Sequence, residues 1–214
     1  MTKSTIFAFR VFQTLNKLME NKCIFYRKIA VVLYDVENYE KLNLEKPEYM
    51  IKRINAIDQE TEDKIKKALQ QMDFRPLPFD LEEAKKRLEN KYRFVVIEHD
   101  GEFVGWTWDA VGFMYIPELE ETIRLKDREA FSFNTYIHKD HRNKGLNKLM
   151  LHGKVSFLQD ENFTKEWGHI WSWNIPSLTS FTHMGWKIIG YYYYFKIFCI
   201  KIRYRGYKRT ECSI

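Results

Sequence analysis

The residues best placed to do chemistry lie in the loop 141–147, which joins a predicted strand at 130–137 to a predicted helix at 145–159. The first N–H groups of a helix have no intrahelical acceptor and carry the positive end of the helix dipole. Gly145 lets the backbone approach a ligand without a Cβ in the way. Three cations surround this glycine: Arg142, Lys144 and Lys148. The loop is therefore predicted to bind an anion, and a pyrophosphate is its natural guest.

A second pattern follows at 171–186. Trp171-Ser172-Trp173-Asn174 ends a predicted strand, Ser177 opens a predicted helix at 177–184, and Gly185-Trp186 follows that helix. In this order and at this spacing, the stretches 134–150 and 171–186 resemble the acetyl-CoA binding motifs of the GNAT superfamily of N-acetyltransferases. The resemblance extends over about residues 48–198.

The resemblance implies that coenzyme A lies between strand 130–137 and strand 170–174, with acetyl-CoA as the co-substrate. The pyrophosphate would meet the backbone amides of 143–147, and the pantetheine would pair with the backbone at 136–137. An amide near Tyr136 or Ile137 would polarise the thioester carbonyl. The implied cofactor-binding residues are Tyr136, Ile137, Arg142, Asn143, Lys144, Gly145, Leu146, Asn147, Asn174 and Ser177.

The sequence departs from the family where proton transfer is concerned. Many members have a Tyr on the last helix that acts as the acid, but the corresponding residue here is Phe181, which has no proton to donate. Thr182 or His183 would have to replace it, or the thiolate leaves without help. Many members also have a carboxylate in the middle of the strand 130–137, where this chain has none. The candidate catalytic residues are Tyr136, His183, Asn134 and Glu129.

Aromatic residues offer a candidate pocket for the acceptor. Four residues are predicted to line it and bind substrate: Trp106, Trp108, Asp109 and Trp173. Tryptophans on strands are also common core residues, so a purely structural role is the alternative. His138, Asp140 and His141 lie in one loop without a further ligand residue at useful spacing, and no metal site is predicted.

Charge is distributed unevenly along the chain. Residues 1–28 and residues 196–214 each carry six Lys or Arg against one Glu, while the whole 214-residue chain has a net charge of +6. Such basic ends favour an anionic surface, so peripheral contact with a membrane is one expectation. The aromatic and basic tail could also stack on nucleic acid, but without an established binding fold a solvated strand end is preferred. Three widely spaced Cys and no apolar stretch of about 20 residues indicate a cytoplasmic protein.

Periodicity predicts one mixed α/β unit: a mainly antiparallel central sheet with flanking helices, preceded by an N-terminal helix and strand. Apolar residues recur at helical spacing over 5–20, and 23–36 has strand composition. We expect residues 1–44 to form a basic extension and 45–214 the GNAT-like domain. Asp58 and Asp80 are predicted helix caps, Asp100-Gly101 a tight hairpin turn, and 109–128 a loop or short helix. The segment 186–204 is expected to be one final strand.

The sequence thus predicts an N-acyltransferase, with acetyl as the expected group and a primary amine of a small molecule as the acceptor. An amino sugar in surface-polysaccharide synthesis is the preferred acceptor, and transfer would be direct, through a ternary complex. The alternative is a coenzyme A binding or scaffolding protein at an anionic surface that has lost turnover, since Phe181 replaces the expected acid.

Overall fold

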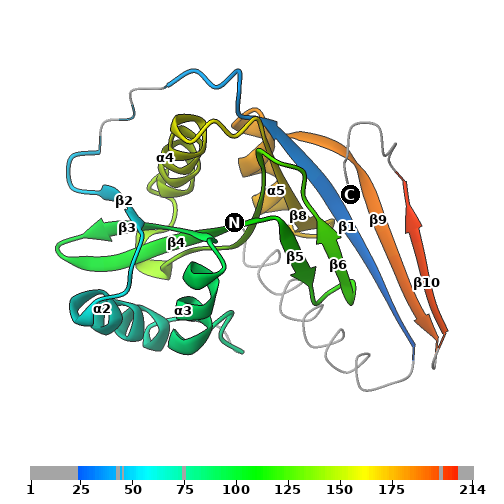
Figure 1. Ribbon diagram of the computed structural model, residues 1–214, viewed down its shortest axis with the longest axis horizontal. Helices are drawn as coiled ribbons and strands as arrows, with labels where there is room; N and C mark the ends of the chain where they lie inside the picture. The colour runs from blue at the N-terminus through cyan, green and yellow to red at the C-terminus, as the bar shows by residue number, and fades with distance from the viewer. Residues whose placement is uncertain (1–23, 42–43, 45, 74–75, 198–199, 207–214) are drawn as a thin grey trace.

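The computed structural model describes residues 24–206 apart from 42–43, 45, 74–75 and 198–199. Within this part, four α-helices pack on the two faces of an eight-stranded sheet, and a two-stranded hairpin lies beside it (Figure 1). The elements in chain order are β1 (Ile24–Asp35), β2 (Met50–Ile54), α2 (Gln59–Gln70), α3 (Leu81–Glu89), β3 (Arg93–His99), β4 (Glu102–Val111), β5 (Phe113–Ile116), β6 (Glu121–Arg124), β7 (Glu129–Ile137), a 3₁₀ turn (Lys139–His141), α4 (Leu146–Asp160), β8 (Lys165–Trp171), α5 (Ile175–His183), β9 (Lys187–Ile197) and β10 (Ile200–Arg205).

The strands of the large sheet follow the order β10-β9-β1-β8-β7-β4-β3-β2. Every neighbouring pair is antiparallel except β7 and β8, which are parallel. The predicted mixed α/β fold with a mainly antiparallel sheet is therefore confirmed. β1 comes from the segment expected to precede the main domain, yet it lies inside the sheet between β8 and β9.

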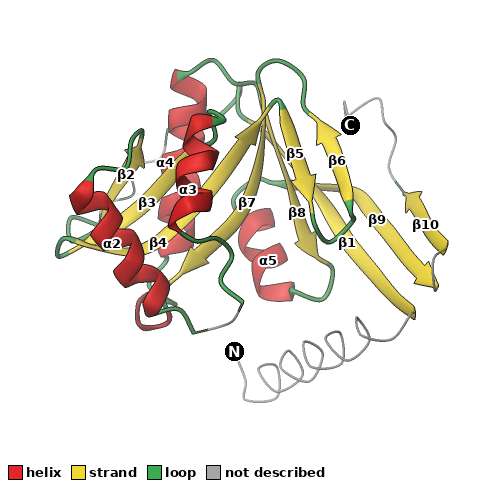
Figure 2. Ribbon diagram, turned by 60° about the horizontal axis from the view of Figure 1, so that its bottom comes forward, coloured by secondary structure: helices red, strands yellow, loops and turns green. Residues whose placement is uncertain are grey.

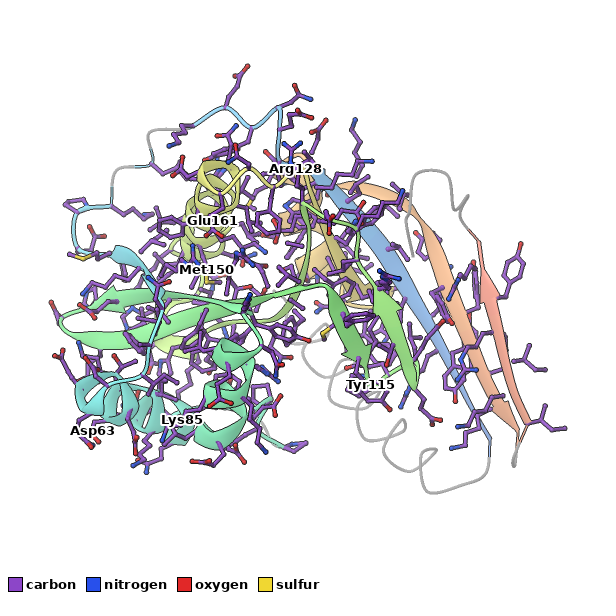
Figure 3. All side chains as sticks on the ribbon, in the orientation of Figure 1. Asp63, Lys85, Tyr115, Arg128, Met150 and Glu161 are labelled. Atoms are coloured by element: carbon purple, nitrogen blue, oxygen red, sulfur yellow. The ribbon has the colours of Figure 1, made fainter. Side chains whose placement is uncertain are left out.

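Helices α2 and α3 cover one face of the sheet. Both begin as predicted: the carboxylates of Asp58 and Asp80 accept hydrogen bonds from the N–H groups of Thr61 and Glu83, each at 2.8 Å. Their apolar sides pack on β3 and β4, where Phe94 and the two strand tryptophans are buried. Figure 3 shows the exposed Asp63 on the outer side of α2.

Helices α4 and α5 cover the opposite face. Leu151 of α4 and Leu178 of α5 share an apolar cluster with Ala30 and Val32 of β1. Figure 3 shows the buried Met150 between α4 and the sheet. Only a 3₁₀ turn and a short loop separate β7 from α4, so the N-terminus of α4 lies near the C-terminal end of that strand.

Two turn and strand predictions have opposite outcomes. Asp100 and Gly101 have positive φ values of 48° and 80°, which confirms the tight turn between β3 and β4. The expected loop or short helix at 109–128 is wrong, because β4 continues to Val111 and the hairpin β5–β6 follows. Apolar residues of this hairpin pack on the sheet next to Ile29 and Val31, a long-range contact that local composition did not indicate.

The two ends of the chain also differ from a local reading of the sequence. The expected final strand at 186–204 is two strands, β9 and β10, which pair with each other. The amphipathic helix predicted at 5–20 lies outside the described residues.

Candidate active site

The sheet opens between β7 and β8. The two strands pair only where 129–132 meets 165–168. Figure 2 shows them diverging toward their C-terminal ends. A cavity of about 280 Å³ lies at the divergence, lined by 132–136 of β7 and 168–171 of β8. Separated strands leave backbone N–H and C=O groups along both walls that a ligand can pair with.

The lining comes from both faces of the sheet. Pro78, in the segment between α2 and α3, contributes on one face, and Asn174, Ser177 and Phe181 contribute from α5 and its cap on the other. Two molecules that approach from opposite faces could therefore meet within the gap.

β7 bulges at the wall of this cavity. Trp106 and Trp108 of β4 pair with Tyr136 and Phe133, so two steps along β4 match three along β7. Asn134 sits in the bulge with a positive φ of 52°, a conformation that Asn tolerates better than most residues. A bulge locally interrupts the ladder of hydrogen bonds. Residues 134–135 therefore have no register partner on β4 and lie at the cavity wall next to Tyr136, where the thioester carbonyl is predicted to be polarised.

The predicted anion loop has the required backbone geometry. Asn143 and Gly145 have positive φ values of 63° and 74°. The first bond of α4 runs from the N–H of Leu149 to the C=O of Gly145 at 3.2 Å, so the N–H groups before it have no intrahelical acceptor. A Cβ on Gly145 would meet only the Lys46 side chain, at 3.6 Å. The need for glycine here is therefore conformational rather than a matter of space.

Arg142 is already engaged by the protein. Its guanidinium donates to both carboxylate oxygens of Asp73, at 2.8 and 2.9 Å, and its Nε donates to the C=O of Ile137 at 3.0 Å. Burial opposes the charge on Asp73, but hydrogen bonds from Arg142 and Tyr136 outweigh it and lower its pKa. Arg142 therefore ties the loop to the segment after α2, whereas Lys144 is the exposed cation beside Gly145.

Tyr136 faces α2 and α3. Its hydroxyl donates to Asp73 at 3.0 Å, and burial together with that bond raises the pKa of Tyr136 to about 12. A phenol in this state gives up its proton reluctantly. The structure therefore favours a structural role for the Tyr136 side chain and leaves its backbone at the cavity wall.

The other predicted catalytic residues are dispersed. Asn134 lines the cavity, and its side chain donates to the C=O of Pro78 at 3.2 Å. Glu129 is buried at the start of β7, where it accepts from the N–H of Lys126 at 3.1 Å, and it does not line the cavity. His183 is exposed at the end of α5 and does not line the cavity either.

Phe181 lies in the cavity wall, where the family has its acid. It is buried and contacts the Trp186 ring at a centroid distance of 5.0 Å. Thr182, the other proposed substitute, donates its hydroxyl to the C=O of Leu178 at 2.9 Å. Neither Thr182 nor His183 replaces the missing hydroxyl in this geometry.

The predicted acceptor residues are not grouped in a pocket. Trp106 and Trp108 are buried under α2 and α3, and Trp108 stacks on Phe94 with ring centroids 4.2 Å apart. Asp109 is buried on the other face, and Trp173 does not line the cavity itself but stacks on Trp171, which does. The structure therefore favours the alternative of a purely structural role for Trp106 and Trp108, because the helices that pack on β4 cover them.

Three predicted cofactor residues act through their backbone or as links between elements. Leu146 is buried, so only its backbone faces the loop. The Asn147 amide donates to the Ser180 hydroxyl at 2.7 Å and joins α4 to α5. Asn174 caps α5 by accepting from the N–H of Ser177 at 3.3 Å, which supports the structural role that Asn suits.

His169 is a cavity residue that the sequence analysis missed. It lines the gap from β8, and both ring nitrogens are buried with no hydrogen-bond partner among the described residues. Burial, with a smaller contribution from Arg205, lowers the pKa of His169 to about 3. The imidazole is therefore neutral at neutral pH and can accept a hydrogen bond. Its place on a strand between Trp167 and Trp171 gave no separate signal.

Lys154 was also missed, although its spacing could have revealed it. It lies four residues after Met150 and four before Leu158, on the buried side of α4, and its side chain is fully buried. Its ammonium contacts Asp109 of β4, at 3.3 Å, and Glu166 of β8. It also donates to the Ser132 hydroxyl at 2.5 Å, and Ser132 lines the cavity.

Among the described residues, no group of three or more His, Cys, Asp or Glu is arranged to hold a metal ion. No helix in the described ranges is long and apolar enough to cross a membrane.

No curated protein sequence matches this chain, whereas solved structures do match it. Solved structures that share the fold include a Drosophila protein (TM-score 0.55, 10% identity), a putative GNAT acetyltransferase from Novosphingobium aromaticivorans (0.54, 8%) and the glucosamine N-acetyltransferase region of a fungal multi-domain GH3 β-N-acetylglucosaminidase (0.58, 12%). They cover 86%, 80% and 91% of this chain, which in turn spans 56%, 66% and 22% of theirs.

A sequence model of the acetyltransferase (GNAT) family matches residues 57–186, from the start of α2 to the end of α5. This range contains the parallel pair β7–β8, the bulge and the loop 143–147. Because the match extends over more than half of the 214 residues, the chain belongs to the acetyltransferase (GNAT) family.

Proposed function

We propose that this protein transfers an acetyl group from acetyl-CoA to a primary amine of a small molecule. The observation that carries the proposal is the cavity between β7 and β8, which has a bulged strand as one wall and lining residues from both faces of the sheet. A donor and an acceptor that enter from opposite faces suit direct transfer in a ternary complex.

The residues of the loop and the gap fit acetyl-CoA. The left-handed residues Asn143 and Gly145 and the start of α4 offer several N–H groups at 143–147, and exposed Lys144 and Lys148 add positive charge for a pyrophosphate. The unpaired strand edges suit the amides of a pantetheine arm. The thioester supplies the acyl group, while the protein holds the carbonyl against the bulge amides and keeps bulk water out of the gap.

The acceptor amine must lose a proton as it forms its bond to the carbonyl carbon. His169, neutral and without a partner in the described structure, supports a role as the group that accepts a hydrogen bond from that amine. A weakly basic imidazole suits the proton of a nitrogen that becomes acidic only as the new bond forms.

Calorimetry with acetyl-CoA tests the donor site. The wild type is expected to bind, and Gly145→Glu to lose binding, because a carboxylate would stand where the pyrophosphate is held. Gly145→Ala is the matched control: it carries the same backbone strain at a φ of 74° without the charge, so it should weaken binding less. Absence of binding by the wild type would contradict the proposal.

The second candidate function is coenzyme A binding without turnover. Phe181 in the cavity wall favours it, since the family's acid is replaced there by a ring with no hydroxyl. If the protein binds acetyl-CoA but releases no thiol with any member of a panel of amines, this second function is the correct one. The panel should include amino sugars, because an amino sugar of surface-polysaccharide synthesis remains the predicted acceptor.

Contact with an anionic membrane through the basic ends remains a prediction. In the described part of the C-terminal end, Lys201 and Arg205 pair with Glu120 and Glu121, and Arg203 donates to the C=O groups of 119–120. These cations are satisfied within the protein, so the residues outside the described ranges would have to supply most of the attraction.

A further inference from the structure

The cavity wall carries a hydroxyl group, that of Ser132, in a position to replace the missing acid. Ser132 and Phe181 line the same space, Ser132 from β7 and Phe181 from α5. The Lys154 ammonium lies 5.3 Å from the centroid of the Trp186 ring, against which Phe181 packs. The buried cation is therefore on the same side of the sheet as the position where the family has its hydroxyl.

The bonding of Lys154 fixes the direction of the Ser132 hydroxyl. An ammonium has three protons to donate and accepts none. Its three acceptors here are Asp109, Ser132 and Glu166. Ser132 must accept from Lys154, so its own proton is free for another acceptor, and the described structure provides none.

We propose that Ser132, held by Lys154, donates the proton to the departing thiolate of coenzyme A. This inference rests on the proposed function. Ser132 is the catalytic residue in it, and Lys154 is a positioning residue that also resupplies the proton.

Acyl transfer to the amine conserves protons and electrons. The amine nitrogen bonds to the carbonyl carbon, the carbon–sulfur bond breaks, and sulfur leaves with the electron pair. Ser132 gives its proton to sulfur and receives one from the Lys154 ammonium. The amine proton is released to solvent, and Lys154 is reprotonated from solvent through its carboxyl neighbours, so that no net proton is gained or lost.

The environment of Lys154 keeps the donor charged. Burial opposes its charge, but Asp109 and Glu166 outweigh burial and raise the pKa of Lys154. Burial also raises the pKa of Glu166 well above its ordinary value, against the attraction of Lys154 and with the help of the Asp109 charge. The Lys154 ammonium is thus held between two buried carboxyl groups and next to the Ser132 hydroxyl.

The first test measures the thiol of bound coenzyme A without any turnover. Thiolate absorbance in the ultraviolet, followed against pH, gives the pKa of that thiol in wild type, Ser132→Ala and Ser132→Thr. Loss of a hydrogen bond to a charged sulfur is expected to raise it by about one to two units in Ser132→Ala. Ser132→Thr keeps a hydroxyl donor, so it should give a smaller rise.

Thr107→Val is the matched control for loss of a buried hydroxyl. Thr107 is fully buried and shares a 2.8 Å hydrogen bond with Thr135 of the cavity wall, but it does not itself line the cavity and has no hydrogen bond to Lys154. The thiol pKa should stay at the wild-type value in this variant.

The second test is rescue. Ser132→Ala should slow thiol release by about 100-fold, and adding Phe181→Tyr should restore most of the rate by returning a hydroxyl to the opposite wall. Failure of the wild type to bind coenzyme A would sink the proposed function itself. Normal binding with an unchanged thiol pKa in Ser132→Ala, or a rate loss that Phe181→Tyr does not repair, would overturn only the role of Ser132.

Discussion

Two groups of charged side chains join distant parts of this chain, one in the interior and one at the surface. The interior group is Lys154 with Asp109 and Glu166, all at most 1% exposed. The surface group joins Glu120 and Glu121, at the tip of the β5–β6 hairpin, to cations of β9 and β10, with side chains 22–40% exposed. Both groups link residues far apart in sequence.

The difference between them lies in how charge is balanced. In the interior each donor needs an acceptor and the net charge must be small, because water cannot compensate an error. At the surface, water and dissolved ions screen the charges, so extra cations are tolerated. The interior group adjoins the cavity and can therefore move a proton, whereas the surface group only fastens the hairpin to the sheet.

The largest expected effect is that of Lys154→Met. The variant leaves the Asp109 carboxylate buried without its counter-ion, and removing one partner of a buried pair costs about 3–5 kcal/mol. Urea unfolding should show this loss. Lys148→Met, an exposed position on the same helix, is the control and should change stability by about 0.5 kcal/mol or less. Equal effects at the two positions would mean that the buried charges are not balanced as the geometry indicates.

A smaller and pH-dependent effect is expected for Glu166→Gln. Because burial raises the pKa of Glu166 in the folded state, the folded protein holds a proton that the unfolded chain has already released. The wild type therefore loses stability as pH rises from the ordinary Glu value toward the raised one, by up to about 1.4 kcal/mol per pH unit. Gln mimics the protonated carboxyl and does not titrate, so the variant should lack this slope.

Urea midpoints measured from pH 4.5 upward would show the two curves separating, with the variant the more stable at the upper end. Parallel curves would mean that Glu166 is ionised in the folded protein. The buried ammonium would then face two carboxylates.

Local chemistry made half of this fold predictable from sequence. Asp58, Asp80 and Asp100-Gly101 act on residues within one turn of themselves, so their roles could be read directly. The strand, loop and helix around Gly145 follow from the same kind of signal. The mixed α/β fold was predictable because these elements succeed one another in order.

The features of the fold and site that the sequence did not predict depend on contacts between residues far apart in the chain. The acid-rich segment around 118–121 was predicted to be a loop or short helix, but it bonds to residues 71 to 91 positions away, among them Arg27, Tyr192 and Arg205. Trp106 and Trp108 were candidates for a pocket although strand tryptophans are more often core, and the positions of α2 and α3 over them show that they belong to the core. Ser132 has a candidate role only because Lys154 donates a hydrogen bond to it, and Lys154 belongs to α4, on the face of the sheet opposite α2 and α3.

The smallest expected effect is that of Glu121→Gln in the surface group. Its carboxylate accepts from the hydroxyl of the buried Tyr192 and pairs with Arg205, whose side chain is 32% exposed. The amide keeps a hydrogen-bonding group but loses the charge, so the expected cost is about 0.5–1 kcal/mol at low salt. Because ions of the solvent screen such a pair, most of the difference from wild type should vanish in about 1 M salt. Glu82→Gln, an exposed side chain on α3, serves as the control and should show little change. If the cost of Glu121→Gln persisted at high salt, the hairpin contact would behave like the interior group, and the contrast between the two would have to be abandoned.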